Sequence, residues 1–124
     1  MEKTFTASHE WVQNKPEGVV IGISNHAATE IGEVLHVALP EAGDRLERDD
    51  VLVEIESAKS IHEIPTPLSG TVVGINQALI DDPGLLHRSP EDEGWLIILA
   101  ADENLDTCGL LSAEAYRGMV ASDA

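Results

Sequence analysis

The chain has 124 residues, 43% of them hydrophobic, which is enough for one domain with a sizeable core and too few for two ordinary domains. Acidic residues number 23 against 7 lysines and arginines, which gives a formal net charge of −16 at pH 7. A surface this acidic repels phosphate backbones and anionic lipid headgroups, so we expect neither a nucleic acid nor a membrane as partner.

Short apolar segments separated by turn residues indicate a mainly β protein. The expected strands, in chain order, cover residues 19–23, 34–39, 51–55, 61–64, 71–75 and 95–99. Alternation of apolar and polar residues in two of them predicts which side chains face the core. These core-facing residues are Leu35, Val37 and Leu39, with His36 on the opposite face, and Val51, Val53 and Ile55.

Three short helices are expected, each preceded by a residue whose side chain can accept a hydrogen bond from the first helical turn. They are 26–31 after Ser24 or Asn25 and ended by Gly32, a helix of one or two turns after Asn76 that runs through Ile80 and is stopped by Pro83 and Gly84, and a C-terminal helix after Ser112. The pattern shows no linker or internal boundary. It therefore predicts one domain over residues 1–124, mainly antiparallel β with short helices at its edges.

Motifs for catalysis or metal binding are missing from the sequence. The five histidines lack the spacing of a zinc-binding helix, and there is no Gly-rich phosphate loop or nucleophile elbow. Cys108 is the only cysteine, which excludes an intrachain disulfide and a multi-cysteine metal site. The lack of these motifs leads us to expect that the protein is not an enzyme. The N-terminus does not resemble a signal peptide, so we expect the protein to be cytoplasmic.

Lys59 carries the strongest functional signal. It lies between two predicted strands, among small residues, which places it at the tip of a β-hairpin. One interpretation is a solvated surface lysine among Glu54, Glu56 and Glu63. The other is an amine presented to a modifying enzyme that attaches a swinging arm. A Schiff-base lysine would need burial and a depressed pKa, which a glutamate-rich hairpin does not provide.

The attachment-site segment resembles that of the biotinyl/lipoyl proteins, because Glu56-Ser57-Ala58-Lys59 is followed by Thr66-Pro67-Leu68-Ser69-Gly70. Further segments in matching order are similar to the H-protein family of the glycine cleavage system. They cover residues 9–12, 20–27, 31–34, 37–44, 93–97 and 113–116. The resemblance implies a hybrid barrel-sandwich of two antiparallel sheets, with lipoic acid amide-linked to Lys59. Biotin is less expected, since biotin sites resemble Met-Lys-Met.

The resemblance also implies partners. A lipoate ligase or lipoyl transferase would load the arm, and glycine decarboxylase, aminomethyltransferase and dihydrolipoamide dehydrogenase would use it. The residues around Lys59 depart from the usual glycine-cleavage pattern, with Ala58 before the lysine and Pro65-Thr66 ahead of the turn. These departures keep an alternative open: a related lipoate-binding protein that carries sulfur intermediates to a heterodisulfide-reductase-like complex.

Two acidic residues match acids that line the docking cleft of the arm in this family. Glu10 lies in the His-Glu-Trp motif, and Glu63 lies four residues after Lys59. In a partly desolvated cleft, carboxylates stabilise a cationic aminomethyl-lipoyl arm by roughly 1–3 kcal/mol. The alternative for each residue is an ordinary exposed carboxylate.

Overall fold

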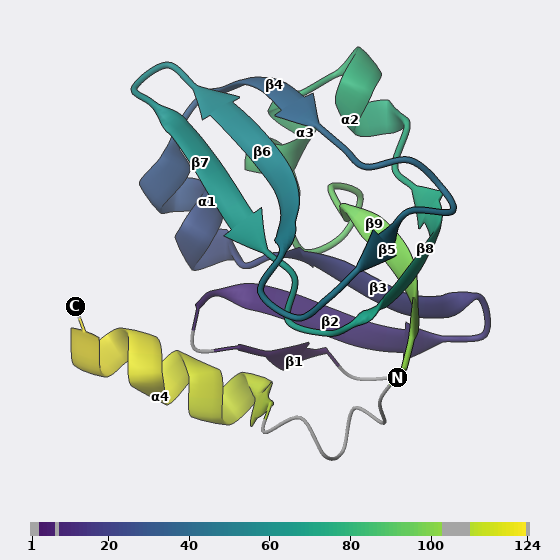
Figure 1. Cartoon of the computed structure of the whole chain (residues 1–124). Coiled ribbons are helices and arrows are strands. Elements are labelled where there is room, and N and C mark those ends of the chain that lie inside the picture. The colour runs from purple at the N-terminus through teal and green to yellow at the C-terminus, as the bar shows by residue number, and fades with distance from the viewer. Residues whose placement is uncertain (1–2, 7, 103–109, 124) are drawn as a thin grey trace.

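The computed structural model describes residues 3–6, 8–102 and 110–123, which form two antiparallel sheets with short helices around them (Figure 1). The seven-stranded sheet has the order β10 (Leu111–Ser112), β1 (Thr4–Phe5), β2 (Glu10–Lys15), β3 (Gly18–Ile23), β9 (Ile97–Ala101), β8 (Gly70–Ile75) and β5 (Arg45–Leu46). The three-stranded sheet has the order β4 (Val34–Ala38), β6 (Val51–Ser57) and β7 (Ile61–Pro65). The helices are α1 (Asn25–Ile31), α2 (Ala78–Asp81), α3 (Gly84–Arg88) and α4 (Ala113–Asp123).

This architecture confirms the predicted barrel-sandwich of two antiparallel sheets with a C-terminal helix. Local capping signals account for two of the helices. The Ser24 hydroxyl accepts a hydrogen bond from the main-chain N–H of Ala27 at 3.1 Å, and Gly32, with φ of 80°, ends α1. The Ser112 hydroxyl accepts one from the N–H of Ala115 at 3.1 Å at the start of α4.

The second helix ends close to the predicted position, since α2 ends at Asp81 and the sequence predicts a helix through Ile80. Pro83 and Gly84 then begin the separate helix α3, which the sequence pattern does not predict. Proline suits a helix start, since its fixed φ is already helical and it has no N–H to leave unbonded.

Gln77 occupies the N-cap position of α2, and the side-chain oxygen of Asn76 accepts a hydrogen bond from the N–H of Ala78 at 3.3 Å. The amide nitrogen of Asn76 donates to the carbonyls of Glu93 and Trp95, both at 2.8 Å, and so joins the start of α2 to the chain before β9.

The predicted face of Leu35 is wrong as well. The register between β4 and β6 shifts between Val34 and His36, which marks a β-bulge. A bulge places one extra residue in one strand and breaks its alternation. Val34 and Val37 are therefore buried while Leu35 is 50% exposed, and His36 faces solvent as predicted.

A second irregularity corrects the predicted face of Val51. The pairing of β6 with β7 shifts between Val51 and Val53. Val51 is consequently 47% exposed, and Leu52 and Val53 are both buried. Alternation resumes at Ile55, which is fully buried as predicted.

One hydrophobic core fills the space between the two sheets. Its members come from both sheets and from the three short helices that close the ends: Val12, Val19, Ile21, Ile23, Ala28, Ile31, Val34, Val37, Leu46, Leu52, Val53, Ile55, Leu68, Val72, Leu79, Leu86, Leu96, Ile97 and Leu99. The three-stranded sheet thus buries its inner face against the larger sheet. Its outer face and the hairpin tip remain in solvent.

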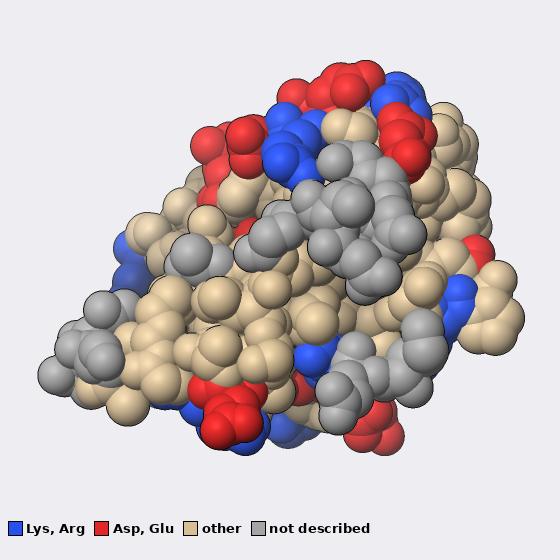
Figure 2. All heavy atoms as spheres, turned by 90° about the horizontal axis from the view of Figure 1, so that it is seen from below, with Lys and Arg blue, Asp and Glu red and all other residues tan. Residues whose placement is uncertain are grey.

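A second cluster attaches α4 to the outside of the larger sheet. The rings of Phe5 and Tyr116 are stacked with centroids 4.5 Å apart, and Trp11 and Val20 complete the cluster. The Trp11 indole N–H donates to the carbonyl of Pro90 at 2.9 Å. Uncharged side chains cover most of the described part of the face seen from below in Figure 2. Within the described ranges, no helix is long and apolar enough to cross a membrane.

The contact between Gly22 and Trp11 generates a stability prediction. A Cβ atom at Gly22 would lie 2.5–2.6 Å from three atoms of the Trp11 indole, which the Pro90 hydrogen bond holds in place. We expect Gly22→Ala to lower the free energy of unfolding by about 1–3 kcal/mol, measured by urea denaturation. Gly118→Ala in α4 is the matched control, because its Cβ meets no described atom within 4 Å. Gly118→Ala is expected to leave the free energy of unfolding unchanged or to raise it by up to about 1 kcal/mol. Equal effects of the two substitutions would contradict the packing argument.

Candidate functional site

Lys59 lies at the tip of the β6–β7 hairpin, as the sequence predicts. Strand β6 ends at Ser57 and β7 begins at Ile61, so residues 58–60 form the tip. All three are exposed. In Figure 1 the tip lies on the side of the molecule opposite to β1. Lys59 is therefore an exposed residue at a hairpin tip, and its two neighbours in sequence, Ala58 and Ser60, are small.

The hairpin tip is ordered by hydrogen bonds from Ser57. The main-chain N–H of Ser57 donates to the carbonyl of Ser60 at 2.8 Å, and the hydroxyl of Ser57 donates to the same carbonyl at 3.0 Å. The same hydroxyl oxygen accepts hydrogen bonds from the N–H groups of Lys59 and Ser60, each at 3.2 Å. The N–H of Ala58 donates to the carbonyl of Glu33 at 3.1 Å. The tip is thus fixed internally and tied to the connection between α1 and β4.

The outer face of the three-stranded sheet is acidic near this tip. Glu54 and Glu63 are direct cross-strand partners on β6 and β7, and both are exposed. Glu56 is exposed one pleat closer to the tip, opposite Ile61, which is itself 63% exposed. Like charges directly opposite each other are unfavourable, so the Glu54–Glu63 pair does not stabilise the hairpin. Glu63 has the exposure of an ordinary surface carboxylate.

Glu10 differs, because it is buried. It begins β2, is only 3% exposed, and accepts a hydrogen bond from the hydroxyl of Thr6 at 2.9 Å. Burial raises the pKa of Glu10 to about 6; the hydrogen bond from Thr6 lowers it and the negative charge of Asp49 raises it further. Titratable groups with burial-shifted pKa values are concentrated at functional sites. The structure places Glu10 and Glu63 on different sheets, one buried and one in solvent, and not in one shared buried pocket.

A hydrogen-bond network beside Glu10 reaches the C-terminal helix. The hydroxyl of Tyr116 lies 2.6 Å from Nδ1 of His9 and 2.7 Å from the hydroxyl of Ser24. The N–H of Ser24 donates to the carbonyl of His9 at 2.9 Å. Burial raises the pKa of Tyr116, the bond from Ser24 lowers it, and the charges of Glu91 and Glu10 raise it. No sequence spacing indicates this network, because His9 and Tyr116 lie 107 residues apart.

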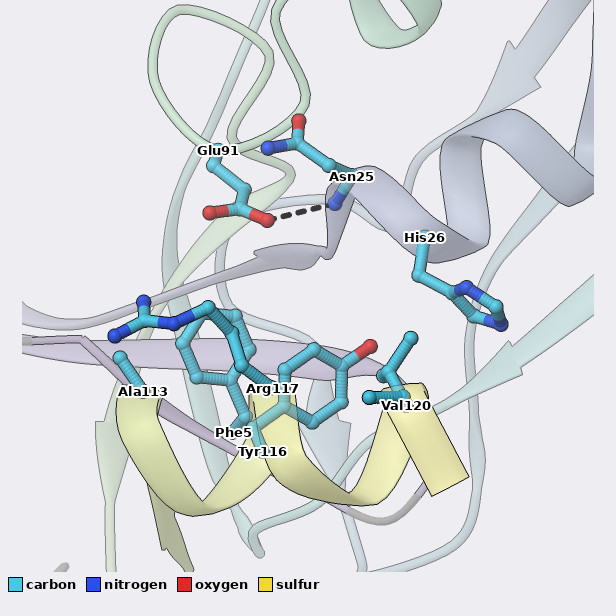
Figure 3. Close-up of a pocket in the computed structure, with 9 residues that line it drawn as sticks. Phe5, Asn25, His26, Glu91, Ala113, Tyr116, Arg117 and Val120 are labelled. Carbon is cyan, nitrogen blue, oxygen red and sulfur yellow. Dashed lines mark hydrogen bonds between the residues drawn. The ribbon is translucent and has the colours of Figure 1, made fainter. Parts of the chain in front are cut away.

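A groove of about 440 Å³ lies next to this network, between α4 and the start of α1 (Figure 3). Arg117 and Val120 of α4 line one side of it, and Asn25 lies across from them. Glu91 accepts a hydrogen bond from the N–H of Asn25 at 2.7 Å. The described residues that line the groove do not include Lys59, Glu10 or Glu63.

Metal ligands are not gathered anywhere in the described part of the chain. Within it, no group of three or more histidine, cysteine, aspartate or glutamate residues is placed to hold a metal ion. Cys108 lies outside the described residues.

Known proteins resemble this chain over nearly its whole length. The family model described as "Glycine cleavage H-protein" matches residues 3–123. A glycine cleavage system H protein of Kocuria rhizophila is 42% identical over 121 residues, which cover 96% of this chain and 94% of that protein. One of Thermotoga maritima is 36% identical and covers 98% of each chain. A crystal structure of a glycine cleavage system H protein from Mycobacterium marinum superposes with a TM-score of 0.85, at 31% identity and 97% coverage of both chains.

The buried carboxyl of Glu10 generates a prediction about pH. Because its pKa is raised from 4.5 to about 6 in the fold, the folded chain binds this proton more tightly than the unfolded chain does. This contribution to the free energy of unfolding therefore falls as the pH rises from about 4.5 through 6, then levels off. We expect Glu10→Gln to be more stable than the wild type by about 1–2 kcal/mol at pH 7.5 and equally stable at pH 4.

Urea denaturation at both pH values measures this difference. Glu63→Gln is the exposed control and is expected to change the free energy of unfolding by less than about 0.5 kcal/mol at either pH. A constant difference between Glu10→Gln and the wild type at the two pH values would show that the Glu10 charge has no such cost.

Proposed function

Because the chain belongs to the glycine cleavage H-protein family, we propose that Lys59 is the residue that carries its lipoyl group. Members of this family are carriers without an active site of their own, and lipoic acid is attached covalently to one of their lysines. The chain is therefore a lipoyl carrier and not an enzyme. Its relatives bear the glycine cleavage name, which favours that system over the sulfur-carrying alternative.

The observation that carries the proposal is the exposed, ordered position of Lys59. Amide formation joins its Nζ to the carboxyl carbon of lipoate and needs an amine that a second protein can reach. The small exposed neighbours Ala58 and Ser60 leave room for such an enzyme. Amide formation also removes the positive charge of Lys59, so the arm is no longer attracted to Glu54, Glu56 and Glu63 on the same hairpin.

The other two lysines are less suited to this role. Nζ of Lys3 lies 5.0 Å from the centroid of the Trp11 ring, in a cation–π contact that favours its charged, unmodified form. Lys15 is the last residue of β2 and pairs with Gly18 across a tight turn. Its backbone therefore belongs to the sheet ladder and not to a projecting tip.

Glu10 and Glu63 are proposed to favour the cationic cargo of the arm. When bound, lipoic acid would supply a dithiolane whose S–S bond can accept the aminomethyl unit and two electrons together; the two electrons would pass to the dehydrogenase after that unit has been transferred. A carboxylate held in a buried position attracts an ammonium group more strongly than one in water does. Glu10 meets this condition with its burial and raised pKa. Glu63 is exposed, so screening by solvent gives it the weaker role.

The proposed partners follow from the same reaction sequence. They are a lipoate ligase or lipoyl transferase, then glycine decarboxylase, aminomethyltransferase and dihydrolipoamide dehydrogenase. We further propose that residues 1–124 form one carrier domain, supported by the single core that both sheets share. The proposed compartment is the cytoplasm, and a chain with one cysteine has no intrachain disulfide that would need an oxidising one.

The first functional prediction is that lipoylation requires Lys59. Incubation with a lipoate–protein ligase, ATP and lipoate should add one lipoyl mass to the wild type and none to Lys59→Arg, as measured by intact mass spectrometry. Lys3→Arg and Lys15→Arg are the matched controls and should gain the full lipoyl mass. A lipoylated Lys59→Arg protein would refute the assignment.

The second functional prediction concerns the cargo. The lipoylated protein should support exchange of bicarbonate with the carboxyl group of glycine when the decarboxylase from the same organism is added. In Glu10→Ala the covalently loaded aminomethyl group should be lost faster by hydrolysis, because the carboxylate that favours the cationic arm in its docked position is gone. The substitution is expected to speed this hydrolysis by about tenfold, equivalent to one charge-assisted hydrogen bond. Absence of exchange with protein shown to be lipoylated at Lys59 would contradict the glycine cleavage assignment.

A further inference from the structure

Exposure at the end of a hairpin does not by itself distinguish Lys59 from the other lysines. Lys15 is also exposed and also ends a strand, with only Pro16 and Glu17 between it and the start of β3. The shape of the backbone around each lysine is one feature by which a modifying enzyme can accept one and reject the other. If Lys59 is the attachment site, as proposed above, the groups that shape this backbone also affect its modification.

The two hairpins differ in how their turns are bonded. Lys15 is paired with Gly18 in the β2–β3 ladder, so its main chain follows the strand. Lys59 lies beyond the last paired residues, Glu56 and Ile61, in a segment that the ladder does not hold. Its N–H is bound instead by the side chain of Ser57, at 3.2 Å.

The hydroxyl of Ser57 takes part in three of the hydrogen bonds that close the tip. It accepts from the N–H groups of Lys59 and Ser60 and donates to the carbonyl of Ser60. The side chain is only 5% exposed, so it sits under the tip and not beside the lysine amine. Serine hydroxyls often stabilise turns in this way, by bonding to backbone groups two or three residues further along.

We propose that Ser57 is a positioning residue for the modification of Lys59. Its hydroxyl fixes the main chain of residues 58–60, and the bond from Ala58 to the Glu33 carbonyl orients that segment on the domain. The Lys59 side chain then projects from a backbone of defined shape, which lowers the entropy cost of docking to the enzyme. Ser57 does not touch the reacting amine and acts through the backbone alone.

The test compares lipoylation kinetics of Ser57→Ala, Ser57→Thr and Ser60→Ala with those of the wild type, using a lipoate–protein ligase, ATP and lipoate. Removing the hydroxyl in Ser57→Ala should lower kcat/KM by about tenfold, chiefly through KM, because the tip must be ordered on binding. Ser57→Thr keeps the hydroxyl and should recover most of the loss. Ser60→Ala keeps all the tip hydrogen bonds, since Ser60 contributes only main-chain atoms to them, and should match the wild type.

Amide hydrogen exchange gives a second readout that does not depend on the ligase. The N–H groups of Lys59 and Ser60 should exchange about tenfold faster in Ser57→Ala than in the wild type, with the core strands unchanged. If Ser57→Ala does not fold, Ser57→Cys keeps the side-chain volume with a weaker hydrogen-bonding group and is expected to show the same two changes.

The outcomes separate this inference from the proposed function. Unaltered kcat/KM and unaltered exchange in Ser57→Ala would overturn the positioning role while leaving Lys59 as the attachment site. Equal losses in Ser57→Ala and Ser60→Ala would also overturn it, because the enzyme would then be reading hydroxyl groups and not backbone order. Lipoylation of Lys59→Arg, in contrast, would overturn the proposed function itself.

Discussion

The apolar interface between the two sheets is the constraint on which the rest of the structure depends. Val37, Val53 and Ile55 of the three-stranded sheet pack in the same core as Ile21 and Ile97 of the larger sheet. A small sheet with one charged face is marginal in water unless its other face is buried. Burial of the inner face therefore allows the outer face to carry glutamates, and allows the hairpin to end in an exposed amine without weakening the core.

Much of this fold follows from short stretches of sequence, and the failures have a common physical cause. Ser24, Gly32 and Ser112 act on the first or last turn of their own helix, so capping is readable locally. The faces of Leu35 and Val51 depend on two bulges, and each bulge is set by how β6 pairs with one of its two neighbours. A periodicity argument treats each strand alone and cannot locate them.

In the candidate site, too, some features are predictable from local sequence and others are not. The hairpin-tip position of Lys59 is predictable because the two strands and the small residues between them are adjacent in sequence, and Ser57, two residues before the lysine, is a local turn signal. The burial of Glu10 is not predictable from the residues beside it in the sequence, and one of the charges that raise its pKa, that of Asp49, lies far along the chain. Glu63 is the opposite case. Its position four residues after Lys59 matches that of a docking acid in the family, but it lies on the outward face of β7 and is exposed.

Exposed and buried carboxylates in this chain act over different distances. Surface carboxylates such as Glu54 and Glu56 interact through water, where a Debye length of about 8 Å at physiological ionic strength screens them. They give the chain a long-range attraction for cationic surfaces that weakens as salt is added. Glu10 is shielded from that screening by burial, and its raised pKa shows that its charge lacks a full counterpart in the fold. Under the role proposed for Glu10, a cation docked beside it would supply this counterpart, and the same desolvation that destabilises Glu10 alone would strengthen its hold on the cationic cargo.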